Sequence, residues 1–188
     1  MFCTAQPART LEQFTDETDR VVQIRVGDTL PLGDIRIRVL KGAHIAFQMK
    51  RIFDTMTPWR VLRYWRNMPF LLWANHVFKD GGETVAFSIQ AAGKTILLLG
   101  SLALDEREEY PRQADLLILP YSGNNNLVEE ADKIIERLRP RRILLSHFDD
   151  AFPPMSRSVD TRELKRILYR KWPDIQAVKP AYGKSIIL

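Results

Sequence analysis

Cysteine is nearly absent from this sequence: the 188 residues include only Cys3. A single cysteine cannot form an internal disulfide, which is typical of proteins from reducing compartments, so we expect a cytoplasmic protein. Long apolar runs are also lacking. The longest candidate, residues 68–78, is interrupted by polar side chains and falls short of the roughly 18 residues that a membrane-spanning helix needs. The first 20 residues lack the basic and apolar segments of a secretory signal.

Several short catalytic motifs are missing as well. The sequence contains no His-x-His pair, no Cys-x-x-Cys pair and no glycine-rich phosphate loop. Ser101 follows an apolar run, but no Gly-x-Ser-x-Gly motif surrounds it. A serine nucleophile of the elbow type is therefore not expected.

The composition is that of one globular domain. Apolar residues make up 45% of the chain and charged residues 27%, and 188 residues correspond to about one domain of roughly 100–200 residues. We expect a single domain over residues 1–188. The net charge of +5 is compatible with a nucleic-acid partner, but an ordinary solubility charge is the preferred interpretation.

Hydrophobic patterning predicts an α/β fold with mixed sheets. Strands are predicted at 21–26, 35–40, 84–90, 95–99, 114–119, 143–146 and 185–188, and helices at 46–55, 59–67, 127–138 and from 160 onward. The first two strands are expected to form a hairpin. The segment at about 45–80 is predicted to be a helical insert rich in aromatic and basic residues, in which Pro69 ends the second helix.

Two of the three histidines follow predicted strands. His44 comes four residues after the predicted strand 35–40 and His147 directly after the predicted strand 143–146, and ligand-binding groups gather at strand ends in α/β sheets. Neutral imidazole suits zinc. Asp149 and Asp150 lie close enough in sequence to His147 to orient its ring or to bind metal themselves. A structural histidine beside an acidic turn is the alternative interpretation.

Residues 57–73 interleave arginine with aromatic residues. Such a mixture can contact a membrane surface or single-stranded nucleic acid. The preferred interpretation is a lid helix over a substrate pocket, with Trp59 and Trp65 as substrate contacts, or a buried helix whose arginines reach solvent.

The segments 82–89, 93–100, 114–120 and 140–150 (GETVAFSI, GKTILLLG, ADLLILP and PRRILLSHFDD) together resemble the metallo-β-lactamase superfamily, in its lactonase-like branch. The resemblance implies an αβ/βα sandwich, here partial, with mixed and largely antiparallel sheets. It also implies one or two divalent ions, zinc or else manganese or iron, which activate water for hydrolysis of an ester, lactone or phosphodiester. His44 and His147 match metal-binding histidines of the family, with Asp149 or Asp150 as a further donor.

Two features of the family pattern are missing. The sequence has no H-x-H-x-D-H motif, and Ser101 stands where the family has an aspartate that bridges two metals. The chain thus resembles the carboxy-terminal portion of such an enzyme, for which exposed apolar patches are expected. We expect impaired hydrolysis of a small-molecule substrate by the isolated chain, with a homo-oligomer or complementing chain as a source of ligands. A non-catalytic binding module and a gene remnant are the alternatives.

Overall fold

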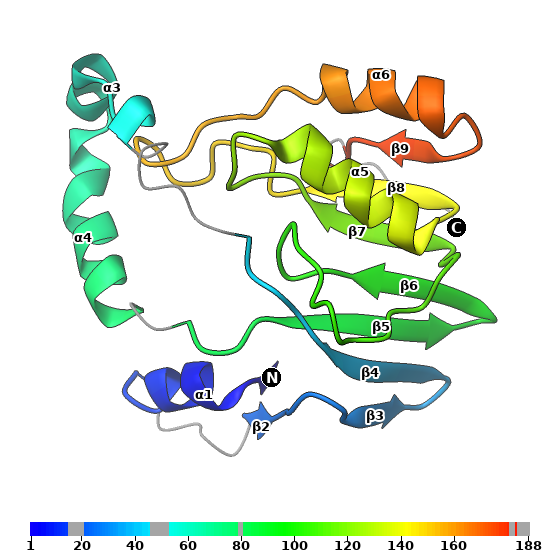
Figure 1. Ribbon diagram of the computed structural model, residues 1–188. Helices are drawn as coiled ribbons and strands as arrows, with labels where there is room; N and C mark the ends of the chain where they lie inside the picture. The colour runs from blue at the N-terminus through cyan, green and yellow to red at the C-terminus, as the bar shows by residue number, and fades with distance from the viewer. Residues whose placement is uncertain (15–20, 46–52, 79–80, 181–182, 184–188) are drawn as a thin grey trace.

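The protein is described by a computed structural model in which residues 1–14, 21–45, 53–78, 81–180 and 183 are placed (Figure 1). The strands are β1 (Phe2–Cys3), β2 (Val22–Gln23), β3 (Thr29–Leu32), β4 (Ile35–Lys41), β5 (Val85–Ala91), β6 (Lys94–Leu98), β7 (Leu116–Pro120), β8 (Arg142–Ser146) and β9 (Gln176–Val178). The helices are α1 (Ala5–Leu11), α3 (Pro58–Arg63), α4 (Met68–Val77), α5 (Leu127–Leu138) and α6 (Arg162–Lys171), with a 3-10 turn at Trp65–Asn67.

Seven strands form one mixed sheet in the order β3-β4-β5-β6-β7-β8-β9. The pairings from β3 to β6 are antiparallel, and those from β6 to β9 are parallel. A separate parallel pair joins β1 to β2. The predicted α/β class with mixed sheets is confirmed, although the main sheet is half parallel rather than largely antiparallel.

The predicted hairpin at the start of the chain is wrong in its first strand. Only Val22–Gln23 of the segment 21–26 forms a strand, and it pairs with β1. The chain turns at Gly27, which has a φ of +94°, and the strand that pairs with β4 begins afterwards, at Thr29. Glycine tolerates this left-handed conformation. The hairpin partner of β4 therefore lies between the two predicted strands, where only a connection was expected.

Helices α5 and α6 cover one face of the sheet beside β7, β8 and β9 (Figure 1). The prediction of α5 over 127–138 is confirmed at both ends, and its apolar stripe is buried against the parallel strands. The innermost strand positions are fully enclosed, as expected for strands with continuous apolar runs. These positions are Leu97, Leu117, Leu119, Ile143 and Leu145.

The opposite face of the sheet is apolar, and most of its side chains are only partly buried, although Val39 and Leu116 on the same face are buried. The strand register places one set of apolar side chains side by side on this face: Ile37, Phe87, Ile89, Ile96, Leu98, Ile118, Leu144 and Val178. Each of them is intermediate in exposure. We call this set the open sheet face, and it agrees with the expectation of exposed apolar patches.

The helical insert contains two helices along one side of the molecule (Figure 1). Pro58 begins α3, as predicted. Pro69 does not end a helix. It lies in the first turn of α4, where its missing N–H is not needed and its fixed φ suits a helix. None of the described helices is long and apolar enough to cross a membrane. The predicted strand at 185–188 and most of the predicted helix at 46–55 lie outside the described residues.

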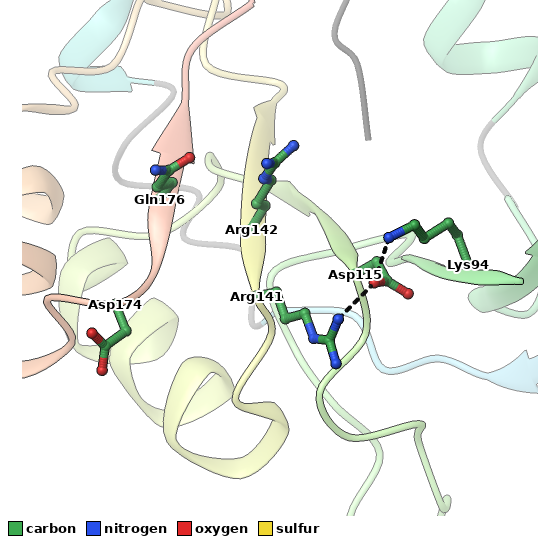
Figure 2. Close-up of a pocket in the computed structure, with 6 residues that line it drawn as sticks. All are labelled: Lys94, Asp115, Arg141, Arg142, Asp174 and Gln176. Carbon is green, nitrogen blue, oxygen red and sulfur yellow. Dashed lines mark hydrogen bonds and ion pairs between the residues drawn. The ribbon is translucent and has the colours of Figure 1, made fainter.

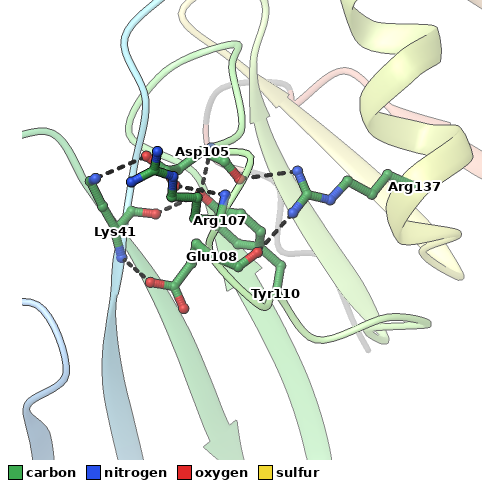
Figure 3. A network of polar contacts seen from close by, with 6 residues as sticks. All are labelled: Lys41, Asp105, Arg107, Glu108, Tyr110 and Arg137. Carbon is green, nitrogen blue, oxygen red and sulfur yellow. Dashed lines mark hydrogen bonds and ion pairs between the residues drawn. The ribbon is translucent and has the colours of Figure 1, made fainter.

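A polar network fixes the end of β4 (Figure 3). The hydroxyl of Tyr110 donates to the carbonyl of Lys41 at 2.5 Å and accepts from the backbone N–H of Asp105 at 3.0 Å. Arg137 of α5 donates to the carbonyls of Asp105 and Glu108. Burial raises the pKa of Tyr110. The neutral phenol therefore connects the start of the segment that carries His44 with the loop before β7.

Candidate functional site

The parallel strands β6, β7 and β8 end at a common edge of the sheet. Ser101 lies shortly after β6, Ser122 after β7 and His147 directly after β8. Neighbouring strands lie about 4.8 Å apart, so the ends of β6 and β8 are separated by about two such spacings. Carboxyl ends of parallel strands are where ligands commonly bind in α/β sheets.

His44 is held at the same edge. The backbone N–H of Ile45 donates to the hydroxyl oxygen of buried Ser101 at 3.1 Å. Nδ1 of His44 lies 2.8 Å from the carbonyl oxygen of Ile45. Because a carbonyl can only accept, Nδ1 is the donor in this hydrogen bond, and in a neutral ring the lone pair is then on Nε2. This tautomer is the one that a metal-binding histidine of the Nε2 type adopts.

His147 is exposed and has a left-handed backbone with a φ of +58°. Such conformations are uncommon for residues other than glycine and concentrate at functional positions. The neighbouring backbone is fixed, because Tyr121 N–H donates to the Ser146 carbonyl at 2.8 Å. The structure therefore places both histidines predicted from the sequence at one edge of the sheet.

Asp150 is held by side chains rather than left available to a ligand. Its carboxylate accepts from Arg60 of α3 and from the hydroxyl of Ser156, each at 2.8 Å. Burial raises the pKa of Asp150, but the hydrogen bonds from Arg60 and Ser156 prevail and hold it below its usual value. Asp149 is exposed. The acidic pair thus includes one carboxylate that anchors α3 to the loop after β8.

The donor set at this edge does not complete a metal centre. Within the ranges placed by the structure, no three His, Cys, Asp or Glu side chains come together in a group that could hold a metal ion. A catalytic zinc site needs about three protein ligands. His44 and His147 are suited to such a site, while Ser101 already accepts a backbone N–H and Asp150 is paired with Arg60. The described residues alone therefore do not fit the metal centre that the resemblance implies.

A pocket of about 310 Å³ lies beside this edge. Its lining comes from Thr55, from α4, from the loop after β7 and from residues 152–157, and the surface of its wall is mostly apolar. The lining residues are Thr55, Leu71, Ala74, Asn75, Ser122, Gly123, Phe152, Met155, Ser156 and Arg157. Gly123 joins the pocket to the histidine segment. A Cβ added there would lie 3.1 Å from the Cγ2 atom of Ile45.

The pocket residues were largely missed by the sequence analysis. Trp59 and Trp65, predicted as substrate contacts, do not line this pocket and are strongly exposed. The inner side of α4 lines it instead, through Leu71, Ala74 and Asn75. Residues 71, 74 and 75 have the i, i+3, i+4 spacing that places side chains on one side of a helix. The sequence therefore contained a signal that these three residues share a face.

A second pocket, of about 270 Å³, lies at the opposite edge, near the beginnings of β6, β7 and β8 (Figure 2). Asp115 lines this pocket and forms two ion pairs there, at 3.5 Å from the ammonium of Lys94 and 3.3 Å from the guanidinium of Arg141. A hydrogen bond from the Thr95 N–H and the nearby cations hold the pKa of Asp115 below its usual value. Its carboxylate thus serves to connect neighbouring strand ends.

Comparisons with known proteins show which fold this is. No protein-family profile matches the chain, and neither does any curated protein. Among solved structures, the metallo-β-lactamase fold protein YhfI from Bacillus subtilis matches with a TM-score of 0.53 and 14% identity, over 96% of this chain and 62% of that one. A possible metal-dependent hydrolase from Veillonella parvula matches with a TM-score of 0.53 and 12% identity, over 100% of this chain and 66% of that one.

An isothiocyanate hydrolase from Delia radicum gut bacteria gives a similar result, with a TM-score of 0.52 and 12% identity, over 100% of this chain and 66% of that one. The chain thus spans slightly less than two thirds of the length of these structures. Identities this low establish the fold alone. This protein has the metallo-β-lactamase fold.

Proposed function

We propose that this chain provides the substrate pocket and two histidine ligands of a metal-dependent hydrolase, and that the isolated chain binds a small ester or lactone without hydrolysing it. The observation that carries the proposal is the apolar pocket at the carboxyl edge of β7, next to the segment that holds His44. The reaction class is supported by solved structures of similar fold that are described as a possible metal-dependent hydrolase and as an isothiocyanate hydrolase.

The lining of the pocket indicates the class of compound. Most of the wall is apolar, with Leu71, Phe152 and Met155 as its large side chains, while Asn75 and Arg157 provide polar hydrogen-bond donors. Pockets of this kind bind the apolar part of a ligand by burial and orient it through a few polar groups. A short acyl chain with a carbonyl oxygen fits both kinds of surface.

Completion of the catalytic site requires groups beyond the described residues. A metal held in this fold lowers the pKa of bound water and polarises the bond to be cleaved. His44 and His147 would hold it, and a third ligand has to come from elsewhere. The open sheet face supports the same conclusion, since a further polypeptide packed on it would bury its apolar side chains.

The first experiment measures zinc binding by the purified chain through equilibrium titration. We expect weak binding that falls at least tenfold in His44→Ala and in His147→Ala. His76→Ala is the matched control, because His76 is an exposed histidine on α4 away from the pocket lining. Equal binding by all three variants and the wild type would show that the two histidines do not form a site.

The second experiment separates binding from turnover with a chromogenic short-chain ester. We expect saturable binding that is lost in Leu71→Arg, whose side chain would fill the pocket, and no turnover with or without zinc. Binding that Leu71→Arg leaves unchanged would place the ester elsewhere. Zinc-dependent turnover that disappears in His147→Ala would show instead that the isolated chain is a complete enzyme.

A further inference from the structure

The outer side of the helical insert exposes an unusual number of large apolar side chains. α3 has no buried residue and α4 has only Leu71, so the buried-helix interpretation of this segment is wrong. The exposed apolar residues of the insert and its surroundings include Trp59 (70% exposed), Leu62 (65%), Trp65 (59%), Phe70 (59%), Trp73 (47%), Phe78 (50%) and Phe14 (52%). Together with Arg63 and Arg66, we call them the aromatic–arginine surface.

Four rings of this surface form one cluster. Trp73 lies at the centre, with ring centroids 6.0 Å from Phe14, 5.9 Å from Phe70 and 6.1 Å from Phe78. Phe14 and Phe78 are themselves 6.2 Å apart. Contiguous exposed apolar patches are rare on monomeric proteins and mark sites of interaction. The cluster thus has the character of a docking site rather than of scattered surface residues.

Residues 57–78 of the helical insert, which carry three of the four rings, have charge of one sign. They contain three arginines and no aspartate or glutamate. Arg60 forms an ion pair with Asp150. Arg63 and Arg66 are exposed, and their guanidinium groups lie over the rings of Tyr64 and Trp65, respectively. In the part of the chain that the structure places, neither of these two arginines forms an ion pair with a carboxylate. They remain available to an anionic partner.

We propose that the aromatic–arginine surface binds the headgroup region of an anionic lipid membrane. Tryptophan and phenylalanine insert at the boundary between headgroups and acyl chains, and arginine binds lipid phosphate. α3 and α4 lie along one side of the molecule (Figure 1), where they can meet a flat surface. The inner side of α4 lines the pocket, so docking brings the pocket next to the bilayer.

A second copy of this chain is a poorer occupant. In a symmetric dimer the same patch meets itself, which would bring Arg63 and Arg66 of one copy close to those of the other. Like charges facing each other across an interface are costly, and residues 57–78 contain no carboxylate to compensate them. Anionic lipid provides the complementary charge. This proposal does not depend on the proposed hydrolase function.

The test is co-sedimentation of the full chain with vesicles of phosphatidylcholine alone and of phosphatidylcholine with phosphatidylserine. We expect at least tenfold tighter binding to the anionic vesicles at low salt, and a clear loss in high salt, because exposed charges are screened. Each arginine near an anionic surface contributes about fivefold in affinity. Arg63→Glu/Arg66→Glu should therefore remove the preference for phosphatidylserine.

A second pair of variants tests the rings. Phe70→Ala/Trp73→Ala should weaken binding to both kinds of vesicle at least tenfold, since it removes inserted apolar area. The matched controls lie on α6. Arg166→Glu/Arg170→Glu makes the same change of charge, and Tyr169→Ala removes an aromatic side chain that is 83% exposed. Both controls should bind vesicles as the wild type does.

Three results would overturn the proposal. The first is no binding to either vesicle at low salt. The second is binding that the α6 controls reduce as much as the insert variants do, which would indicate a general charge effect. The third is a dimer in solution, measured by analytical ultracentrifugation, that Phe70→Ala/Trp73→Ala dissociates, because the surface would then belong to a second copy.

Discussion

The guanidinium of Arg60 lies 2.8 Å from the carboxylate of Asp150, across 90 residues of sequence. The same guanidinium donates to the carbonyl of Ser156 at 2.8 Å. Asn67 adds a hydrogen bond to the carbonyl of Pro153. These contacts attach the helical insert to the loop after His147, so the position of α3 and the shape of that loop depend on each other.

Loss of this ion pair should destabilise the protein. Both side chains are 24% exposed, and a hydrogen bond to a partly buried charge contributes about 1.5–3 kcal/mol. We expect Arg60→Ala to lower the free energy of unfolding by about 1–3 kcal/mol in urea titrations. A double-mutant cycle with Asp150→Asn should give a coupling energy clearly above zero. The exposed pair of Arg162 and Asp160 is the control, and Arg162→Ala should leave stability unchanged.

Stability should fall in acid, in part through Asp132. Burial raises the pKa of Asp132, but hydrogen bonds from Lys171 and Trp172 outweigh this effect and lower it. A lowered pKa in the folded state stabilises the fold at pH values above about 4, the pKa of an unfolded aspartate, and this stabilisation is lost as the pH falls through the folded pKa.

The variant Asp132→Asn tests that assignment. It should lower the free energy of unfolding at pH 7 by about 1–2 kcal/mol, because two charge-assisted hydrogen bonds are weakened. It should also flatten the decline between pH 5 and pH 3 in urea titrations. Glu12→Gln, at an exposed position, should keep the wild-type pH profile. An unchanged decline in Asp132→Asn would assign the acid sensitivity to other carboxylates.

Gly123 should tolerate no side chain, for two separable reasons. Its φ is +102°, and a Cβ would lie 3.1 Å from Ile45. Gly123→Ala should cost about 1–3 kcal/mol of stability from backbone strain and should also weaken ester binding, since Ile45 would move. Gly27 has a φ of +94° but nothing within 4 Å of the added Cβ. Gly27→Ala should therefore reduce stability, measured by thermal unfolding, without reducing ester binding.

Ser101→Asp should increase metal affinity. The hydroxyl lies at the end of β6, bonded to the N–H of Ile45 beside His44, so a carboxylate there would add a third donor to the two histidines. We expect zinc binding at least tenfold tighter than in the wild type, measured by equilibrium titration, at some loss of stability because the position is buried. Ser101→Ala should bind zinc no more tightly than the wild type, because it adds no donor and removes the hydrogen bond that the Ile45 N–H makes to Ser101. No gain in Ser101→Asp would indicate that the two histidines do not approach a common point.

The parallel half of the fold could be predicted from the sequence because its signals are local. The parallel strands β6, β7 and β8 have near-continuous apolar runs, and α5 has an apolar stripe at helical spacing, so these elements were placed to within two residues. The amino-terminal hairpin could not be placed. The partner strand of β4 is the short strand β3, which lies in the predicted connection. The two-residue strand β2 pairs with β1 instead, and no local pattern in the sequence predicts that pairing.

Some features of the candidate site could likewise be predicted from the sequence, and others required the tertiary structure. The sequence by itself determined that His44 and His147 follow strands and that the H-x-H-x-D-H motif is missing. Only the tertiary structure decided that Asp150 pairs with Arg60, that the inner side of α4 lines the pocket, and that the rings of the insert are exposed to solvent. The physical reason is that periodicity reports the character of one segment, whereas ion pairing, pocket walls and exposure depend on which distant segment packs against it.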